Sequence, residues 1–326
     1  MDELKGKKVL LLYARFFNYD TLVKNKLTEL GAVVDLYDAR ANIGKIQKAI
    51  KKIYRGYYFH KMKQYHEGIL RNNTHKEYDF VFSNAYLPAE AIENYRKAYP
   101  KAKFVLYLDD SVENLKGVDK TFNLYDRVIT FDRLDAKDYA IEFRPLFFDD
   151  TYTDPKKVGK QYDLCFIGTI HSDRLKVIEK IEDICQEKGL TFYKFCYLPS
   201  GFMYYYYWLT KKEFRKKPQS YFSYTSLPAK EVAKALSNSS IILDIQHPKQ
   251  TGLTMRTIET LGSKKKLITT NVDIKEYDFY NERDICLIDR EDPQIEDVFL
   301  KTEYEEINQS LYQKYSLNGW ISFVFQ

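Results

Sequence analysis

Long apolar runs are missing from this sequence. It contains no stretch of about 18 apolar residues, the length at which a segment becomes a candidate to cross a bilayer. Its first residues, MDELKGKKVLLLYARF, lead straight into a strand-like run and show no signal-peptide pattern. These absences argue against a membrane-spanning or exported protein, and we expect the chain to be cytoplasmic.

Cysteine is scarce as well. The four cysteines, Cys165, Cys185, Cys196 and Cys286, form no CxxC pair, so their spacing predicts no zinc site. Three of them stand in apolar strand-like or helix-like contexts, which is typical of reduced thiols in a hydrophobic core. We predict that the protein binds no metal.

The chain also has little excess charge. Its 51 Lys and Arg against 46 Asp and Glu give a net charge of +5, which is too small to argue for nucleic-acid binding but suits anionic ligands such as nucleotide sugars or lipid phosphates. Tyrosine and phenylalanine, in contrast, are abundant, with 29 and 21 residues. Tyrosines on a surface can stack on sugar rings or lie at a bilayer interface, and an AT-rich genome explains the same composition.

The sequence divides into two halves of similar size. A length of 326 residues suits two domains of about 150 residues each. The polar segment TYTDPKKVGKQ (151–161) is followed abruptly by the strand-like YDLCFIGT, as expected where a second domain begins. We therefore predict domains at residues 1–152 and 153–326.

The apolar pattern predicts alternating strands and helices in both halves, which favours an α/β fold with parallel sheets. In the first half we predict strands at 8–13, 32–37, 78–83, 103–108 and 127–131, a helix at 20–30 and a long helical pattern over 42–71. In the second half we predict strands at 162–169, 191–197, 240–245, 266–270 and 285–288, and helices at 172–187, 229–237, 251–261 and 295–315. The first strand is not followed by GxGxxG, which argues against dinucleotide binding there.

Residues 239–271 form the most informative βαβ unit. Thr251 or Thr254 can cap its helix, and Gly252 lets an anion approach backbone N–H groups at the positive end of the helix dipole. Arg256 and Glu259 follow Gly252 at helical spacing, so we expect Arg256 beside a phosphate and Glu259 to accept hydrogen bonds from sugar hydroxyls. The alternative is an ordinary surface ion pair between Arg256 and Glu259, with Gly252 as a plain loop glycine.

A polar strand end faces the same opening. Asp244, Gln246 and His247 follow a buried strand directly. In open α/β sheets the opening at such strand ends is where ligands bind, so we include His247 among the donor-side residues.

The segment GLTMRTIETLGSKKKLITTN (252–271) resembles the donor-binding segment of group 1-type glycosyltransferases with the GT-B fold, especially the branch in capsular polysaccharide and spore-coat glycan pathways. The resemblance implies two Rossmann-like domains whose parallel sheets face a central cleft, a last helix that returns to the N-terminal domain, and a nucleotide-sugar donor without a cofactor. It further implies that the amides of Gly252, Leu253 and Thr254 bind phosphate, that Arg256 supports it, and that Glu259 binds ribose. Retaining members usually have a second Glu where this chain has Thr251, so the stereochemical outcome is not implied.

The same resemblance covers most of the chain, although its specific part is only about twenty residues long. It suggests that Gly168, Thr169, His171 and nearby Arg174 close on the donor phosphates, and Arg174 as a structural residue on the helix surface is the alternative. It also suggests that Tyr224 and Leu227 lie beside the base of the nucleotide, and loop packing is the alternative for both residues.

Two strand ends in the first half carry candidate catalytic groups. Asn84-Ala85-Tyr86 and Asp109-Asp110-Ser111 should meet at one edge of the sheet, where Asp109 or Asp110 could deprotonate the acceptor hydroxyl. A helix N-cap and a metal-binding DxD pair are the alternatives.

We expect the acceptor to lie on the N-terminal domain. The residues that we place on the acceptor side are Phe17, Asn18, Asn84 and Tyr86, and plain packing is the alternative for Phe16 and Phe17.

Our leading hypothesis is a metal-independent transferase that moves a sugar from a nucleotide-diphosphate donor to a growing surface glycan or lipid-linked acceptor. A sugar-nucleotide epimerase or phosphorylase of the same fold, or a non-catalytic sugar-nucleotide or glycan-binding protein, is the alternative. The basic pattern over 42–71, which includes Lys45, Lys48, Lys51 and Lys52, is either a solvated face or a contact with the inner face of a membrane. The block FMYYYYWLTKKEFRKK (202–217) is either a membrane or partner contact or packs against its own domain.

Overall fold

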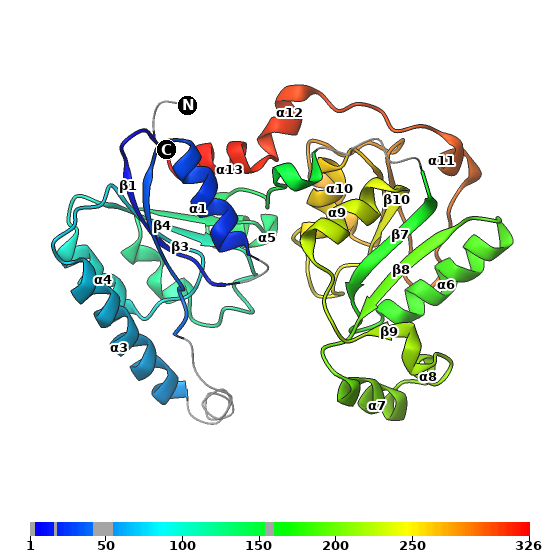
Figure 1. The fold of residues 1–326 in the computed structure, drawn as a ribbon, viewed down its shortest axis with the longest axis horizontal. Coiled ribbons are helices and arrows are strands. Elements are labelled where there is room, and N and C mark those ends of the chain that lie inside the picture. Colours follow the sequence, from blue (N-terminus) through cyan, green and yellow to red (C-terminus); the bar gives the residue numbers. More distant parts are fainter. Residues whose placement is uncertain (1–3, 16–17, 42–54, 154–159) are drawn as a thin grey trace. The chain divides into compact units, whose positions relative to one another are not determined.

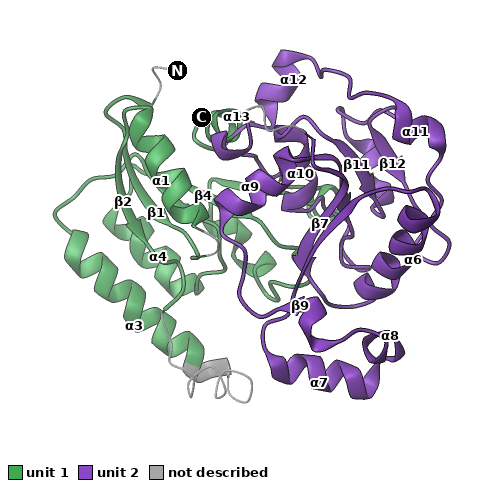
Figure 2. Ribbon diagram, turned by 45° about the vertical axis from the view of Figure 1, so that its right-hand side comes forward, with its two compact units in different colours: residues 1–145, 317–326 green, residues 146–316 purple. Residues whose placement is uncertain are grey.

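The structure is a computed structural model that describes residues 4–15, 18–41, 55–153 and 160–326 (Figure 1). The chain forms two compact units. Unit 1 comprises residues 1–145 and 317–326, and unit 2 comprises residues 146–316 (Figure 2). The first division along the chain thus follows Pro145, earlier than the expected boundary at residue 152, and the last segment of the chain belongs to unit 1.

Unit 1 is built on a six-stranded parallel sheet. Its strands, in the order in which they lie side by side, are β2 (Val33–Tyr37), β1 (Lys8–Leu12), β3 (Phe80–Ser83), β4 (Lys103–Leu108), β5 (Arg127–Thr130) and β6 (Glu142–Phe143). Its helices are α1 (Tyr19–Glu29), α3 (Arg55–Asn73), α4 (Ala89–Ala98), α5 (Arg133–Asp138) and α13 (Leu317–Val324), with a 3-10 turn η2 (Asp119–Leu124). The order of strands reverses between β1 and β3, so a topological switch point lies there.

Both faces of this sheet are covered, which is why its strands are continuous apolar runs. On one face Leu10, Leu12 and Val81 pack with residues of α3 and α4. On the other face the Trp320 ring of α13 lies 4.9 Å from the Tyr107 ring, between centroids. Because successive side chains of a strand point to opposite faces, a run of apolar residues supplies both cores.

The C-terminal helix α13 is held firmly in unit 1. Trp320 is fully buried. The Arg127 guanidinium donates hydrogen bonds to the carbonyl oxygens of Phe323 and Val324 at 2.8 and 3.1 Å, which satisfies backbone groups that the helix end leaves open. Lys103 Nζ donates to the Gln326 carbonyl at 2.7 Å. This helix is therefore part of the unit 1 core rather than a loose tail.

Unit 2 repeats the architecture with a second parallel sheet of six strands. The strands, side by side, are β12 (Ile285–Leu287), β11 (Lys266–Thr269), β10 (Ser239–Asp244), β7 (Tyr162–Thr169), β8 (Phe192–Tyr197) and β9 (Phe222–Ser223). The longer helices are α6 (Arg174–Glu187), α7 (Gly201–Thr210), α9 (Ala229–Ser237) and α10 (Met255–Gly262). Shorter elements are α8 (Lys212–Arg215), α11 (Asp297–Lys301), α12 (Gln309–Lys314) and the 3-10 turns η3 (Asp150–Tyr152), η4 (Gln219–Tyr221) and η5 (Val272–Glu276).

The strand order of unit 2 is that of the doubly wound dinucleotide fold. The chain starts in the middle at β7, moves outward through β8 and β9, returns to β10 beside β7, and then moves outward the other way. The switch point therefore lies between the carboxyl ends of β7 and β10, where ligands bind in folds of this kind. Leu164 and Phe166 of β7 pack in one core cluster with Leu175 of α6, whereas Cys165 packs in another with Leu236 of α9.

Two predicted helices differ from the structure. The helix expected over 295–315 is wrong, because α11 ends at Lys301 and α12 begins only at Gln309. Buried Lys266 explains the break, since its ammonium group donates hydrogen bonds to the carbonyl oxygens of Phe299 and Thr302 and so captures the end of α11. The helix expected over 251–261 begins only at Met255.

Candidate functional site

The carboxyl ends of β7 and β10 are joined by one guanidinium group. Arg174 Nε donates to the Ile245 carbonyl at 2.5 Å and Nη1 donates to the Thr169 carbonyl at 2.8 Å. A Cβ at Gly168 would lie only 3.4 Å from Arg174 Nη1 and 3.1 Å from the Phe166 ring, so the missing side chain leaves room for this contact. Arg174 thus fixes the switch point, and its positive charge lies beside it.

A second arginine connects the next turn to the same edge. Arg290 Nη1 donates to both carboxylate oxygens of Asp173, at 2.8 and 3.0 Å, and Nη2 donates to the Gln246 carbonyl at 2.6 Å. Asp173 precedes α6, so the pair ties the loop after β7 to the loop after β10. Sequence reasoning missed Asp173 and Arg290, because 117 residues separate them and neither belongs to a motif.

The turn before α10 is organised by a buried carboxylate. Asp244, at the end of β10, accepts hydrogen bonds from the hydroxyl groups of Thr254 and Thr257 at 2.6 and 2.7 Å. Thr254 is the N-cap, and its hydroxyl oxygen accepts from the Thr257 N–H at 3.2 Å. Of the two predicted capping residues, Thr254 therefore caps the helix.

Gly252 lies in a turn before the helix, so the predicted helical spacing from Gly252 to Arg256 and Glu259 is wrong. Asn271 Nδ2 donates to the Thr251 carbonyl at 3.0 Å, and Gln250 Nε2 donates to the Gly252 carbonyl at 3.1 Å, which fixes this turn. Sequence reasoning missed Asn271, although its place two residues after β11 was a usable signal.

Two amides of this turn lack an acceptor. Within the part of the chain that the structure describes, neither the Leu253 N–H nor the Thr254 N–H donates a hydrogen bond. Leu253 itself is buried, and Thr254 caps α10. Unpaired amides at a helix start are the groups that bind an anion, as predicted for this segment.

Arg256 and Glu259 form a buried ion pair, so the alternative of a solvated surface pair is wrong. Arg256 Nη1 lies 2.5 Å from Glu259 Oε2, and Glu259 is 4% exposed. Burial opposes ionisation of Arg256, but the Glu259 carboxylate and the other acidic groups nearby, Asp244 among them, together outweigh it, so the pKa of Arg256 is raised. Tyr152 also interacts with Glu259, and burial together with this carboxylate raises the pKa of Tyr152. The Arg256 Nε atom is buried without a hydrogen-bond partner among the described residues.

Two histidines flank the switch point. His171 follows β7 and His247 follows β10, and their ring centroids lie 5.5 Å apart. Loss of hydration, followed by the positive charge of Arg174, lowers the pKa of His171 to about 4. His171 is therefore neutral at neutral pH and can donate or accept one hydrogen bond at each ring nitrogen. The structure brings both predicted histidines together.

Tyr224 and Leu227 lie between β9 and α9, on the same carboxyl-end edge of the sheet. Both are half-buried and pack against the hydrophobic clusters of unit 2. The Tyr224 hydroxyl is buried and has no hydrogen-bond partner within residues 4–15, 18–41, 55–153 and 160–326. An unpaired buried hydroxyl is a costly arrangement, and a bound ligand would relieve that cost.

The predicted meeting of two strand ends in unit 1 is confirmed. Asn84, after β3, donates from Nδ2 to Asp109 Oδ2 at 2.8 Å, and Asp109 follows β4. Asn84 Oδ1 also accepts from the Ala14 N–H at 2.6 Å, so one amide group spans the switch point between β1 and β3. Asn84 is 3% exposed, and its role in this structure is to position Asp109.

Asp109 and Asp110 have different surroundings. Asp110 Oδ1 accepts from the Ser111 N–H at 2.9 Å and from Asn114 Nδ2 at 2.8 Å, so it caps the following turn. Asp109 is solvent-exposed, but the protein that surrounds its carboxylate withdraws hydration and, with the charge of Asp110, raises the pKa of Asp109 to about 6. The hydrogen bond from Asn84 opposes this shift.

The other acceptor-side candidates are dispersed. Asn18 is the N-cap of α1 with a left-handed backbone (φ 63) and no capping hydrogen bond from its side chain. Tyr86 packs edge-on against the Phe59 ring at 5.7 Å. Phe17 lies outside the described residues, as do Phe16 and the lysines of the basic pattern at 45, 48, 51 and 52.

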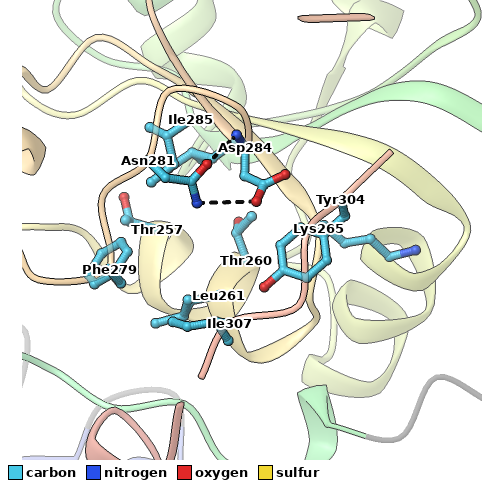
Figure 3. A pocket seen from close by; sticks show the side chains of 11 residues that line it. Thr257, Thr260, Leu261, Lys265, Phe279, Asn281, Asp284, Ile285, Tyr304 and Ile307 are labelled. Atoms are coloured by element: carbon cyan, nitrogen blue, oxygen red, sulfur yellow. Dashed lines mark hydrogen bonds between the residues drawn. The ribbon is translucent and has the colours of Figure 1, made fainter. Parts of the chain in front are cut away.

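A small cavity of about 30 Å³ lies beside α10 (Figure 3). It is lined by Thr257 and Thr260 of the helix and by Asp284 and Tyr304, among others, and Asn281 donates to Asp284 at 3.2 Å. This volume has room for about one water molecule. A nucleotide sugar is far larger, so the candidate donor site is argued from the strand ends and not from this cavity.

No protein-family model and no curated protein matches the chain. Solved structures do resemble it. Anabaena HepE in complex with UDP and glucose gives a TM-score of 0.60 at 11% identity, over 98% of this chain and 99% of that chain. UDP-GlcNAc 2-epimerase of Methanocaldococcus jannaschii gives 0.56 at 13% identity, over 98% and 99%. The catalytic domain of Arabidopsis thaliana starch synthase IV, bound to ADP and acarbose, gives 0.51 at 10% identity, over 98% and 97%.

These likenesses confirm the predicted fold class. The chain has the GT-B fold, with two Rossmann-like domains that each contain a parallel sheet of six strands. No group of three or more His, Cys, Asp or Glu in the described residues is arranged to hold a metal ion. In the same residues no helix is long and apolar enough to span a bilayer.

Proposed function

We propose that the protein is a metal-independent glycosyltransferase that uses a nucleotide-diphosphate sugar. The observation that carries this proposal is the gathering of polar groups at the switch point of unit 2. Two unpaired amides, two histidines, Arg174 and Arg256 suit a phosphate, and Glu259 beside Arg256 can accept hydrogen bonds from hydroxyl groups. The structures of HepE with UDP-glucose and of starch synthase IV with ADP support a nucleotide ligand for this fold.

The leaving diphosphate is the group that this site would stabilise. As the sugar–phosphate bond breaks, negative charge grows on the phosphate oxygens, and the amides of Leu253 and Thr254 would bind it at the start of α10. The charge of Arg256 lies within the same helix turn. Glu259, fixed by Arg256, would accept hydrogen bonds from the ribose hydroxyls.

The acceptor would be activated by unit 1. The acceptor hydroxyl loses its proton while its oxygen bonds to the anomeric carbon, so a carboxylate base is needed. We assign this role to Asp109, because Asp110 is engaged in capping its own turn and Asn84 orients Asp109. We further propose that the acceptor is a growing surface glycan or a lipid-linked glycan.

Binding of UDP to the full chain, measured by isothermal titration calorimetry, tests the donor site. His171→Ala and His247→Ala should each weaken UDP binding about tenfold, because each removes one hydrogen bond to a charged group. His75→Ala is the matched control, since His75 is exposed in unit 1 and should leave binding unchanged. If UDP, GDP, CDP and ADP all fail to bind, the proposal is wrong.

A sugar-nucleotide epimerase is the second candidate, because the Methanocaldococcus jannaschii UDP-GlcNAc 2-epimerase shares the fold over nearly the full chain. An epimerase needs no acceptor. Incubation of the chain with UDP-GlcNAc alone, followed by chromatography of the sugar nucleotide, separates the candidates. A new UDP-sugar isomer supports epimerisation, and an unchanged donor that is consumed only with added glycan supports transfer. UDP binding without either reaction supports a binding protein.

A further inference from the structure

Helix α7 in unit 2 is apolar on all sides but is covered on only one. Its ten residues, GFMYYYYWLT, include no charged side chain. A helix of this composition is normally buried all round. Here Phe202 is 77% exposed and Leu209 66%, and Tyr205 and Tyr206 are exposed between them. These four residues have the spacing i, i+3, i+4 and i+7, so they form one continuous face.

The covered side anchors the helix firmly. Tyr204 and Tyr207 pack against Phe222 and Phe214, with ring centroids 5.7 and 4.8 Å apart, and Phe214 stacks on Phe222 in the core of unit 2. Ser200 caps the start of the helix by accepting from the Met203 N–H. The exposed face is therefore presented by a fixed helix, which follows the carboxyl end of β8 (Figure 1).

Positive charge borders this face. Lys212, Arg215 and Lys216 are exposed directly after α7, and the Arg215 guanidinium donates to the carbonyl oxygens of Trp208 and Leu209 at 3.0 Å each, which places it against the end of the helix. The single acidic residue of segment 201–220, Glu213, is 7% exposed and buried below the surface. The edge of the aromatic face is thus cationic.

We propose that the face of Phe202, Tyr205, Tyr206 and Leu209 binds the surface of an anionic lipid bilayer. Aromatic rings with polar tips suit the boundary between headgroups and acyl chains, and adjacent Lys and Arg are attracted by anionic headgroups. A protein partner would meet the apolar face as well, but it would not by itself call for the cationic border. The proposal goes beyond the donor site and does not depend on transferase activity.

A hydrogen bond within unit 2 connects the end of α7 to a loop of the candidate donor site. The Lys211 ammonium, at the end of α7, donates to the Ser172 carbonyl, in the loop that also carries His171. A bilayer that holds α7 would therefore lie close to the carboxyl edge of the unit 2 sheet.

Sedimentation with vesicles tests the proposal on the full chain. Binding should be strong to phosphatidylcholine vesicles that contain phosphatidylglycerol, weak without phosphatidylglycerol, and reduced by high salt. The double variant Phe202→Ser/Leu209→Ser should bind at least about tenfold more weakly, because its apolar contact with the bilayer is lost. Lys212→Glu/Lys216→Glu should lose the preference for phosphatidylglycerol.

Val272→Ser/Val298→Ser is the matched control, because these valines are 71% and 69% exposed elsewhere in unit 2. It should bind vesicles like the unchanged chain. UDP binding of the Phe202→Ser/Leu209→Ser variant should also be unchanged, so a failure of this proposal is distinguishable from a failure of the donor site.

Tryptophan fluorescence gives a second readout. The chain has two tryptophans, Trp208 on α7, which is 42% exposed, and Trp320, which is fully buried in unit 1. Brominated lipids should quench the fluorescence of Trp208 and leave the fluorescence of Trp320 unchanged. Equal binding to vesicles with and without phosphatidylglycerol overturns the proposal, as does binding that the Phe202→Ser/Leu209→Ser change does not weaken. Self-association in solution that this variant abolishes, without vesicle binding, instead assigns the face to a second copy of the chain.

Discussion

At the scale of single residues, the raised pKa of Asp109 makes the proposed base testable. A general base must be deprotonated, and the pKa of Asp109 is raised to about 6 by lost hydration and by Asp110. Transfer should therefore be present above pH 6 and fall as pH decreases through about 6. The measurement is kcat/KM for UDP release against pH. Asp109→Asn should abolish transfer while UDP binding persists, because the donor groups lie in unit 2.

Two variants serve as controls for this assignment. His171 is neutral well below pH 6, since its pKa is lowered to about 4, so His171→Ala should keep the acid limb near pH 6. Asp110→Asn removes a negative charge next to Asp109. It should shift the fall in kcat/KM to lower pH without abolishing transfer. Transfer by Asp109→Asn at the unchanged rate would assign the base elsewhere.

The Arg256–Glu259 pair shows what the sequence could indicate at this scale. Its spacing allowed an ordinary surface ion pair as the alternative to ligand contacts, but it did not predict a buried pair that Tyr152 approaches from the polar segment 151–161. Breaking a buried pair by removing one partner leaves an uncompensated charge. Loss of UDP binding in a Glu259 variant would therefore not by itself identify a ribose contact, which is why the exposed and half-buried histidines are better probes.

At the scale of elements, the structure agrees best with prediction where a strand is buried on both faces. The predicted limits of β4 and β7 match the structure. In β4 the unbroken apolar run Phe104–Leu108 lies between Lys103 and Asp109, and in β7 the buried run Leu164–Ile167 lies between Asp163 and Gly168. The predicted limits of a helix were wrong where a residue far away in the sequence determines where the helix begins or ends. Lys266 ends α11, and no pattern within residues 295–315 signals that contact. Asp244 and Thr254 likewise set the start of α10 from both sides of an irregular turn.

The packing of α10 gives a prediction at the same scale. A Cβ on Gly262 would lie 2.6 Å from Phe148 Cγ, which is closer than unbonded atoms allow. Gly262→Ala should therefore destabilise unit 2 by about 1–3 kcal/mol through overpacking, despite the gain of up to about 1 kcal/mol in helix propensity. It should also weaken UDP binding, because α10 carries Arg256 and Glu259. Chemical denaturation and calorimetry are the measurements.

Gly68→Ala is the control for helix propensity. Gly68 lies inside α3, and a Cβ there would meet nothing within 4 Å. That change should stabilise unit 1 by about 0.5–1 kcal/mol. If Gly262→Ala were as stabilising as Gly68→Ala, the contact between α10 and Phe148 would be looser than the structure shows.

At the scale of the whole molecule, the chain passes from unit 1 to unit 2 and back again. It leaves unit 1 after Pro145 and returns at Leu317. On the unit 2 side both connections are joined, because the Phe148 N–H donates to the Tyr315 carbonyl at 3.0 Å. The sequence indicated two halves, since each contains its own set of apolar strands. It did not indicate this pairing, which joins residues from opposite ends of unit 2.

Two units with separate cores should respond separately to changes made in each. Trp320→Ala removes a fully buried ring from the unit 1 core and should cost about 3–5 kcal/mol, so it should lower the melting temperature of one transition in differential scanning calorimetry. UDP should raise the melting temperature of the other transition, because a ligand stabilises the state that binds it. Phe202→Ala, at an exposed position, should shift neither. A single transition that both Trp320→Ala and UDP displace as a whole would mean that the units unfold as one, and donor binding in unit 2 would then stabilise the Asp109 site as well.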